Sequence, residues 1–247
     1  MIQTKIVINP QYESFSTFIK SIPDIYNKEG EILYDERNKV KRFLKNNIFF
    51  VVKRYKKPLF FQRVDYTFIR PSKAKRAYLF ALRLKEFQIN TPEAVAYIEI
   101  KKTGLFYTGY FISLNCGDSD TRILRKDSFD KKIAGGLASF LADMHKKGFL
   151  HGDLNLSNIL YHQDTNGCYN FTVIDINRSK FKTNPSREEC LSNMKRLTHQ
   201  KNLLKYIIQQ YAQIRGWNPD KCISEIMKIL KKFERKKYII HFIKMGK

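Results

Sequence analysis

Side chains suited to phosphoryl transfer stand close together in the second half of the chain. The stretch His151-Gly152-Asp153-Leu154-Asn155-Leu156-Ser157-Asn158 places an asparagine five residues after an aspartate, and Val173-Ile174-Asp175 ends an apolar run with a second aspartate. Phosphoryl transfer from ATP needs a carboxylate that accepts the proton of the attacking hydroxyl. It also needs a divalent metal held by a further carboxylate and an amide oxygen. Asp153 suits the first role, and Asn158 with Asp175 suits the second.

A simpler interpretation is a surface turn in which aspartate and asparagine side chains serve as local caps. The flanking sequence favours the chemical interpretation, because a helical pattern precedes the motif and a hairpin that ends in Ile174-Asp175 follows it. Phosphate binding also calls for a lysine on an early strand. Phe50-Val51-Val52-Lys53 has that form, although a charged residue at the end of a strand has many ordinary explanations.

The elements that must position these residues fall into two groups. Strand signals at 5–8, 31–34, 47–55, 94–100 and 105–114, with one helix over 73–88 capped by Ser72, dominate the first part of the chain. After a polar stretch at 115–120, apolar spacing predicts helices over 128–147, 187–213 and 220–236, with a hairpin formed by 158–161 and 171–174. We therefore predict an α+β fold with a sheet-rich N-terminal lobe (1–114) and a mainly helical C-terminal lobe (115–247).

This layout resembles the protein-kinase-like superfamily. In detail it is similar to the lipopolysaccharide core sugar kinases, which phosphorylate heptose or Kdo (3-deoxy-manno-octulosonic acid). The resemblance extends over about residues 30–215 and includes Ser72-Lys73-Ala74-Lys75-Arg76, the stretch Asn90-Thr91-Pro92-Glu93-Ala94-Val95-Ala96-Tyr97 and Ile174-Asp175-Ile176-Asn177-Arg178. It implies a bilobal kinase-like fold, ATP with Mg²⁺ or Mn²⁺, and a sugar or glycolipid acceptor.

The resemblance also implies a role for each candidate residue. Asp153 would be the catalytic base, Asn158 and Asp175 the metal ligands, and Lys53 the lysine that binds the phosphates of ATP. We expect His151 to brace the loop by hydrogen bonding rather than to take part in the chemistry.

Two departures from the family pattern keep a degenerate, inactive kinase open as an alternative. The stretch 34–41 before Lys53 has no glycine to cradle phosphates, so Arg37, Lys39 or Lys41 would have to compensate by charge. The first helix has five basic residues and no acid over 73–85, and Glu86 stands near its end, so the acidic partner of Lys53 stays unassigned.

The form of the catalytic loop favours a small acceptor over a protein. Gly152 replaces the arginine that protein kinases commonly carry between this histidine and aspartate, and only 72 residues follow Asp175. We therefore expect an ATP-dependent kinase of a sugar hydroxyl on a lipid-linked glycan. The alternatives are a kinase of a soluble small molecule or protein, and a pseudokinase or other basic binding protein.

Composition limits the remaining functions. Lys and Arg number 46 against 23 acids, a formal net charge of +23, which favours an anionic partner. No standard nucleic-acid-binding module is legible, so no nucleic acid is expected. The four cysteines, Cys116, Cys168, Cys190 and Cys222, form no CxxC pattern, which argues against a zinc site or a disulfide framework. The start MIQTKIVINPQ has no export pattern and no apolar run is long enough to span a membrane, so we expect a cytoplasmic protein.

The C-terminal segment 221–247 combines nine basic residues and two acids with an apolar set at helical spacing. One interpretation is a final helix that docks on the core and leaves a solvated basic face. The other adds peripheral contact of that face with the anionic inner surface of the cytoplasmic membrane. Both can hold together.

Overall fold

The computed structural model describes residues 1–35 and 38–245, and the chain divides into two compact units, Met1–Gly117 and Asp118–Lys247. The boundary after residue 114 that the sequence suggests lies just before the polar stretch that joins them.

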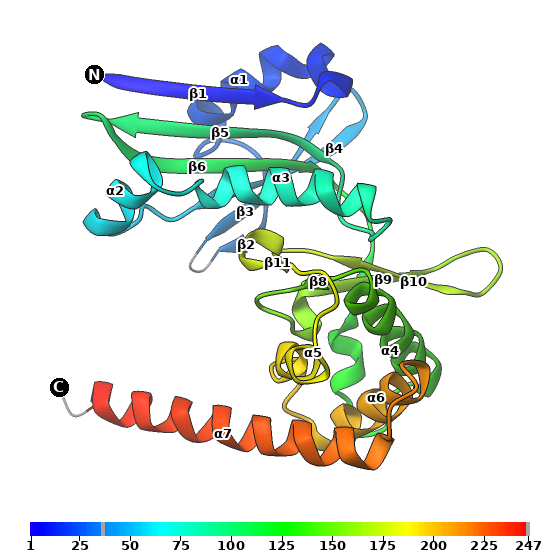
Figure 1. Cartoon of the computed structure of the whole chain (residues 1–247). Coiled ribbons are helices and arrows are strands. Elements are labelled where there is room, and N and C mark those ends of the chain that lie inside the picture. The colour runs from blue at the N-terminus through cyan, green and yellow to red at the C-terminus, as the bar shows by residue number, and fades with distance from the viewer. Residues whose placement is uncertain (36–37, 246–247) are drawn as a thin grey trace. The chain divides into compact units, whose positions relative to one another are not determined.

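The first unit is built on a six-stranded antiparallel sheet in the order β1-β5-β6-β4-β3-β2 (Figure 1). The strands are β1 (Ile2–Ile8), β2 (Glu31–Asp35), β3 (Lys39–Lys45), β4 (Ile48–Tyr55), β5 (Ala94–Lys102) and β6 (Leu105–Leu114). Strand β4 lies inside the sheet, where Lys53 is in register with Val40 of β3 and Phe111 of β6. Two neighbouring ladders therefore hold the backbone of Lys53 in place.

Helices cover both faces of this sheet. Helix α1 (Ser16–Ile25) buries Ile19 and Ile22 on one face, against a cluster that includes Phe50 and Val52 of β4. Helix α3 (Lys73–Glu86) packs on β5 and β6, and α2 (Phe60–Phe68) packs on β6. The Ser72 side chain accepts a hydrogen bond from the Lys75 amide, which confirms the predicted N-cap of α3.

Three elements of this unit were not predicted. Helix α1 and helix α2 lie in segments with mixed patterns, and α2 begins just after Pro58, where the sequence indicates only a break. Strand β3 carries alternating cations, Lys39, Lys41 and Lys45, which hide its periodicity. Within the stretch 34–41, residues 34–35 end β2 and 39–41 begin β3, and Arg37 lies outside the described residues.

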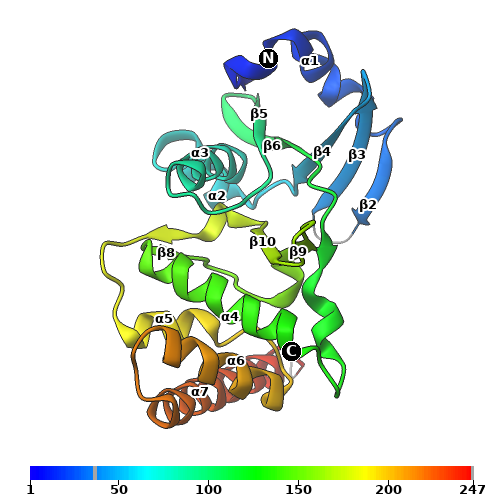
Figure 2. The same cartoon turned by 90° about the vertical axis from the view of Figure 1, so that its right-hand side faces the viewer.

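The second unit combines short strands with four helices (Figures 1 and 2). Its strands are β7 (Ser119–Asp120), β8 (Phe149–Leu150), β9 (Ile159–Gln163), β10 (Tyr169–Val173) and β11 (Lys180–Phe181). Its helices are α4 (Lys131–Lys146), α5 (Arg187–Met194), α6 (Lys201–Ile214) and α7 (Pro219–Met245). The predicted hairpin is confirmed, because β9 and β10 pair in antiparallel fashion on either side of the turn at 164–167.

The single helix expected over 187–213 is wrong. Helix α5 ends at Met194, and α6 begins only at Lys201. Between them the Leu197 carbonyl accepts a hydrogen bond from the Leu156 amide of the catalytic loop, at 3.1 Å. A continuous helix would use that carbonyl internally, so the break is what attaches this segment to the loop.

The first half of α7 docks on α5 and α6. Cys222, Ile226 and Leu230 are buried, and an ion pair of 2.7 Å joins Arg187 of α5 to Glu225 of α7. Among the described residues, no helix is both long enough and apolar enough to cross a bilayer.

Candidate active site

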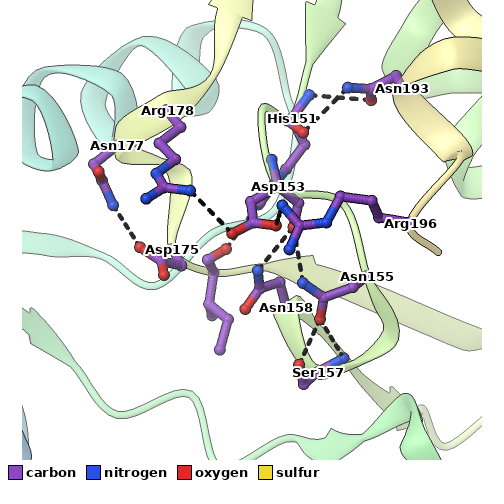
Figure 3. Close-up of polar contacts among 11 residues, drawn as sticks. His151, Asp153, Asn155, Ser157, Asn158, Asp175, Asn177, Arg178, Asn193 and Arg196 are labelled. Carbon is purple, nitrogen blue, oxygen red and sulfur yellow. Dashed lines mark hydrogen bonds and ion pairs between the residues drawn. The ribbon is translucent and has the colours of Figure 1, made fainter. Parts of the chain in front are cut away.

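The predicted catalytic loop lies between β8 and β9, and Asp175 stands two residues after the end of the neighbouring strand β10 (Figure 3). Ile174, which lies between β10 and Asp175, connects this strand end to the catalytic loop. Its amide donates to the Asn158 carbonyl at 3.0 Å, and its own carbonyl accepts from His151 Nε2 at 2.8 Å. Two hydrogen bonds to the backbone of one residue therefore connect the loop that carries Asp153 to the strand end that carries Asp175.

His151 has the bracing role expected of it. Its side chain is buried, and its Nδ1 accepts a hydrogen bond from the Asp153 amide at 3.2 Å. Because that nitrogen accepts, the ring proton is on Nε2, where it donates to Ile174. Burial lowers the pKa of His151, which favours this neutral form.

Asn193 on α5 holds the same loop from the other side. Its Oδ1 accepts from the His151 amide at 3.2 Å, and its Nδ2 donates to the His151 carbonyl at 3.1 Å. The same Oδ1 lies 3.1 Å from Nε2 of the buried His145 on α4. Figure 3 shows Asn193 directed at the backbone of His151. One amide thus attaches the loop to two helices.

The carboxylate of Asp153 lies between two arginines. Arg196 Nη1 is 2.8 Å from Oδ1, and Arg178 Nη1 is 3.5 Å from Oδ2. The carboxylate is largely buried, whereas both arginine side chains are more exposed. Ion pairs with these two arginines restrict rotation of the carboxylate, so the side chain presents a defined oxygen to an incoming hydroxyl. Oδ2 is the less tightly held of the two.

Asn158 and Asp175 offer oxygen donors suited to a magnesium or manganese ion. Asn158 Nδ2 donates to the Asp153 carbonyl at 2.9 Å, which leaves Oδ1 as the accepting end of the amide. Asp175 has a left-handed backbone, with φ of +58°, and its Oδ1 accepts a hydrogen bond from Asn177 Nδ2. Aspartate tolerates this conformation better than most residues do.

An amide and a carboxylate fit Mg²⁺ or Mn²⁺, which bind through one or two protein oxygens together with substrate phosphates. No group of three or more His, Cys, Asp or Glu side chains suited to a metal occurs in the described part of the chain. The donor set therefore matches a metal shared with a phosphate better than a closed structural site.

Gly152 is required by the close approach of the segment after Asp175. A Cβ atom at this position would lie 2.1 Å from the Arg178 carbonyl oxygen and 2.7 Å from its carbonyl carbon. No other residue fits this backbone without displacement, so the arginine common in protein kinases is sterically excluded here.

Lys53 lies on β4 of the first unit. Its neighbour Arg54 donates to Asn27 Oδ1 at 2.7 Å and lies over the Tyr26 ring on the α1 side, so alternation places Lys53 on the opposite face, as expected. That face is covered by α3, whose buried residues Ala74, Ala77, Tyr78, Ala81 and Leu84 include no acid. Glu86 is exposed at the end of α3. The acidic partner expected from kinases therefore does not come from the buried face of this helix.

The lysines near the glycine-free stretch have other contacts. Lys41 is buried and its Nζ donates to the Glu29 carbonyl at 2.7 Å, so its charge serves the fold rather than a bound phosphate. Lys39 is paired with Asp35 at 2.7 Å on the surface.

Sequence reasoning missed Asn193, Arg196 and the contact of Arg178 with Asp153. Arg178 stands in the motif Ile174-Asp175-Ile176-Asn177-Arg178, which is a usable signal. Asn193 and Arg196 stand in a stretch that reads as continuous helix, and their partners are about 40 residues away in the chain. No local pattern identifies them.

Comparison with known proteins agrees with this geometry. The model of the lipopolysaccharide kinase (Kdo/WaaP) family matches residues 51–216, a range that contains Lys53, Asp153, Asn158 and Asp175. No match was found among the curated proteins.

Among solved structures, WaaP in complex with acyl carrier protein aligns over 94% of this chain and 97% of that chain, with a TM-score of 0.62 and 15% identity. The Rio2 kinase from Chaetomium thermophilum, in an ADP/Mg²⁺-phosphoaspartate complex, aligns over 90% of this chain and 77% of that chain, with a TM-score of 0.47 and 13% identity. The bifunctional kinase-methyltransferase WbdD aligns over 79% of this chain and 43% of that chain, with a TM-score of 0.45 and 15% identity.

The likeness to WaaP confirms the expected protein-kinase-like fold, and the family match covers well over half of the chain. The chain therefore belongs to the lipopolysaccharide kinase (Kdo/WaaP) family.

Proposed function

We propose that this protein transfers the γ-phosphoryl group of ATP to a sugar hydroxyl in the Kdo/heptose core of lipopolysaccharide. Family membership supports a phosphotransferase acting on a sugar hydroxyl. The observation that carries the proposal is the connected arrangement of Asp153, Asn158 and Asp175, which His151 and the Ile174 peptide hold together. These are the residue types that phosphoryl transfer requires.

Asp153 acts as the general base in this proposal. An oxygen of the acceptor hydroxyl forms the new bond to the γ-phosphorus, and its proton passes to Asp153. The bond from the γ-phosphorus to the bridging oxygen breaks, and its electron pair leaves with ADP. Oδ2 is the better acceptor, because its arginine contact is 3.5 Å against 2.8 Å for Oδ1.

The remaining residues bind and orient the nucleotide. Asn158 Oδ1 and the Asp175 carboxylate would hold Mg²⁺ or Mn²⁺, which neutralises charge on the phosphates. Lys53, held in the centre of the sheet, would bind the phosphates directly.

The acceptor is proposed to be a glycolipid reached from the cytoplasmic side of the membrane. Helix α7 supports peripheral contact with an anionic surface, because Lys231, Lys232, Arg235 and Lys236 are exposed beyond the docked half of the helix. Tyr238 and Ile239 are exposed as well, whereas the side chains at 240–243 lie outside those described. Such contact would raise the encounter rate with a membrane-confined acceptor.

The structure of WaaP with acyl carrier protein suggests a further partner. An acidic carrier protein would be attracted by the net charge of +23. We propose that this chain binds such a carrier protein, and co-purification of the two proteins would test the binding independently of catalysis.

The test of acceptor class uses the full chain, γ-labelled ATP, Mg²⁺ and lipid extracts from the source organism. Label in a lipopolysaccharide precursor, absent when Asp153→Asn replaces the wild type, would support the proposal. Label only in soluble sugars or protein would favour a different acceptor. Binding of Mg²⁺-ATP with no transfer to any acceptor would indicate a pseudokinase, consistent with the absence of an acid on the buried face of α3.

Removal of residues 234–247 tests the contribution of α7. Binding to anionic vesicles should weaken more than turnover on a soluble acceptor, and binding by the full chain should fall steeply as salt rises. Equal affinity for neutral and anionic vesicles would contradict the role proposed for this helix.

A further inference from the structure

Helix α2 carries a stripe of large apolar side chains on its outer side. Phe60, Phe61, Val64 and Phe68 follow helical spacing, and all three phenylalanines are exposed, with Phe61 at 85% and Phe68 at 74%. Leu59 before the helix and Ile69 after it are also exposed, at 77% and 80%. We call Leu59, Phe60, Phe61, Phe68 and Ile69 the α2 surface. Exposed apolar side chains gathered in this way indicate an interaction site.

The α2 surface is not needed to attach the helix to its own unit. Other side chains of α2 do this: Arg63 Nε donates to the Phe106 carbonyl at 2.9 Å, and Thr67 Oγ1 accepts from the Phe106 amide at 2.9 Å. The Tyr66 ring packs on the Phe106 ring with centroids 5.5 Å apart. Figure 1 shows α2 at one end of the sheet, beside the start of α3. The outer phenylalanines are therefore held in position without being part of the core.

The segment that carries the α2 surface is basic. Residues 56–75 contain six basic side chains and one acid, and that acid, Asp65, is paired with Arg70. The C-terminal end of the helix borders a cavity of about 450 Å³, whose lining includes Phe68, the cations Arg70, Lys75 and Lys101, and the acid Glu99. Exposed apolar side chains within a segment that carries an excess of cations match the acyl boundary and the headgroups of an anionic lipid leaflet.

We propose that the α2 surface inserts into the interface of an anionic lipid bilayer, with the flanking cations on lipid headgroups. Self-association through this surface is disfavoured, because two copies would each carry a net charge of +23. An acidic protein would satisfy the cations, but five exposed apolar residues within eleven positions fit hydrocarbon better than a charged surface. The inference does not depend on the kinase assignment, because insertion needs neither nucleotide nor acceptor.

Insertion can be measured with a tryptophan placed in the α2 surface. The chain has a single tryptophan, Trp217, so the full-length variant Phe61→Trp in a Trp217→Phe background reports only on position 61. With vesicles of phosphatidylglycerol and phosphatidylethanolamine brominated in the acyl chains, we expect a blue-shifted emission and quenching by about half or more. Phe49→Trp in the same background is the matched control, because Phe49 is also exposed but lies at the start of β4. It should show neither change.

A second variant tests the same surface by binding. Phe60→Ser with Phe61→Ser should retain the thermal stability of the wild type, because both side chains are exposed. Its affinity for anionic vesicles should fall by about tenfold or more, since each ring contributes apolar burial. The loss should persist in high salt, which separates it from the electrostatic contribution proposed for α7.

Two outcomes would overturn the inference. The first is no quenching of tryptophan at position 61, and the second is unchanged vesicle affinity of the double serine variant. If that variant with unchanged vesicle affinity instead loses binding to an acidic protein, the α2 surface is a protein-binding site. None of these outcomes bears on phosphate transfer, which the catalytic variants test separately.

Discussion

Replacement of Gly152 by alanine should damage catalysis far more than its small size suggests. The new methyl carbon would lie 2.1 Å from the Arg178 carbonyl oxygen and 2.9 Å from Arg178 Cβ. Carbon–oxygen contacts of this kind lie at about 3.3 Å or more, so the loop and the Arg178 segment must separate by about 1 Å. Both sides of the contact are backbone, and Arg178 is itself one of the two cations at Asp153.

The structure allows a magnitude for each consequence. Overpacking of this kind costs about 1–3 kcal/mol of unfolding free energy, and a misplacement of about 1 Å in a catalytic group costs about 100-fold in rate. We therefore expect a folded variant with a moderately lower melting temperature and kcat reduced by about two orders of magnitude. Urea unfolding and steady-state transfer from ATP would measure the two effects.

The matched control is Gly135→Ala in helix α4. Its Cβ would meet only Tyr206 Oη, at 3.8 Å, so the same substitution should leave turnover unchanged and stabilise the helix by about 1 kcal/mol. If Gly152→Ala keeps turnover within about threefold of the wild type without loss of stability, the close approach is not a constraint and the reasoning fails.

Three further predictions concern the metal, the base and the fold. Asp175→Ala should remove the dependence of nucleotide binding on Mg²⁺, which a thermal shift with and without the metal would show; an unchanged dependence would count against Asp175 as a ligand. Arg196→Ala should lower kcat by about tenfold and leave KM for ATP unchanged, since one side of the Asp153 carboxylate is no longer held. Its unfolding free energy should change by less than about 1 kcal/mol, because Arg196 is an exposed partner. A change in KM alone would contradict this role. Burial lowers the pKa of His145 to about 4. Its contribution to the unfolding free energy is therefore constant above about pH 6.5 and is lost as pH falls towards 4, by about 3 kcal/mol in total. Urea unfolding at about pH 7 and about pH 4.5 would test this, because the unfolding free energy of His145→Gln should fall less between the two pH values than that of the wild type.

The catalytic loop was predictable because its chemistry is local. The spacing from Asp153 to Asn158 and the aspartate at the end of a strand follow directly from what phosphoryl transfer needs, and the turns around them have clear sequence signals. The Ser72 cap and the β9–β10 hairpin were predictable for the same reason.

The supporting contacts were not predictable, because they join distant segments. The α5–α6 break has no proline or glycine, and its one apolar residue, Leu197, keeps helical spacing from Met194 and to Leu204, so helical periodicity conceals the point where Arg196 turns towards Asp153. The reason for Gly152 was also hidden in the sequence. It becomes clear only from the position of the Arg178 carbonyl, 26 residues later in the chain.

The most direct test of the central claim compares wild type with Asp153→Asn in transfer of γ-labelled phosphate from ATP to a lipopolysaccharide core acceptor. The wild type should label the acceptor, and the variant should lose at least about 100-fold in turnover, since it lacks a general base. Its binding of Mg²⁺-ATP, followed by thermal shift, should persist, because Asn158 and Asp175 are intact. A variant that keeps more than a few per cent of wild-type turnover would contradict the assignment of Asp153 as the base.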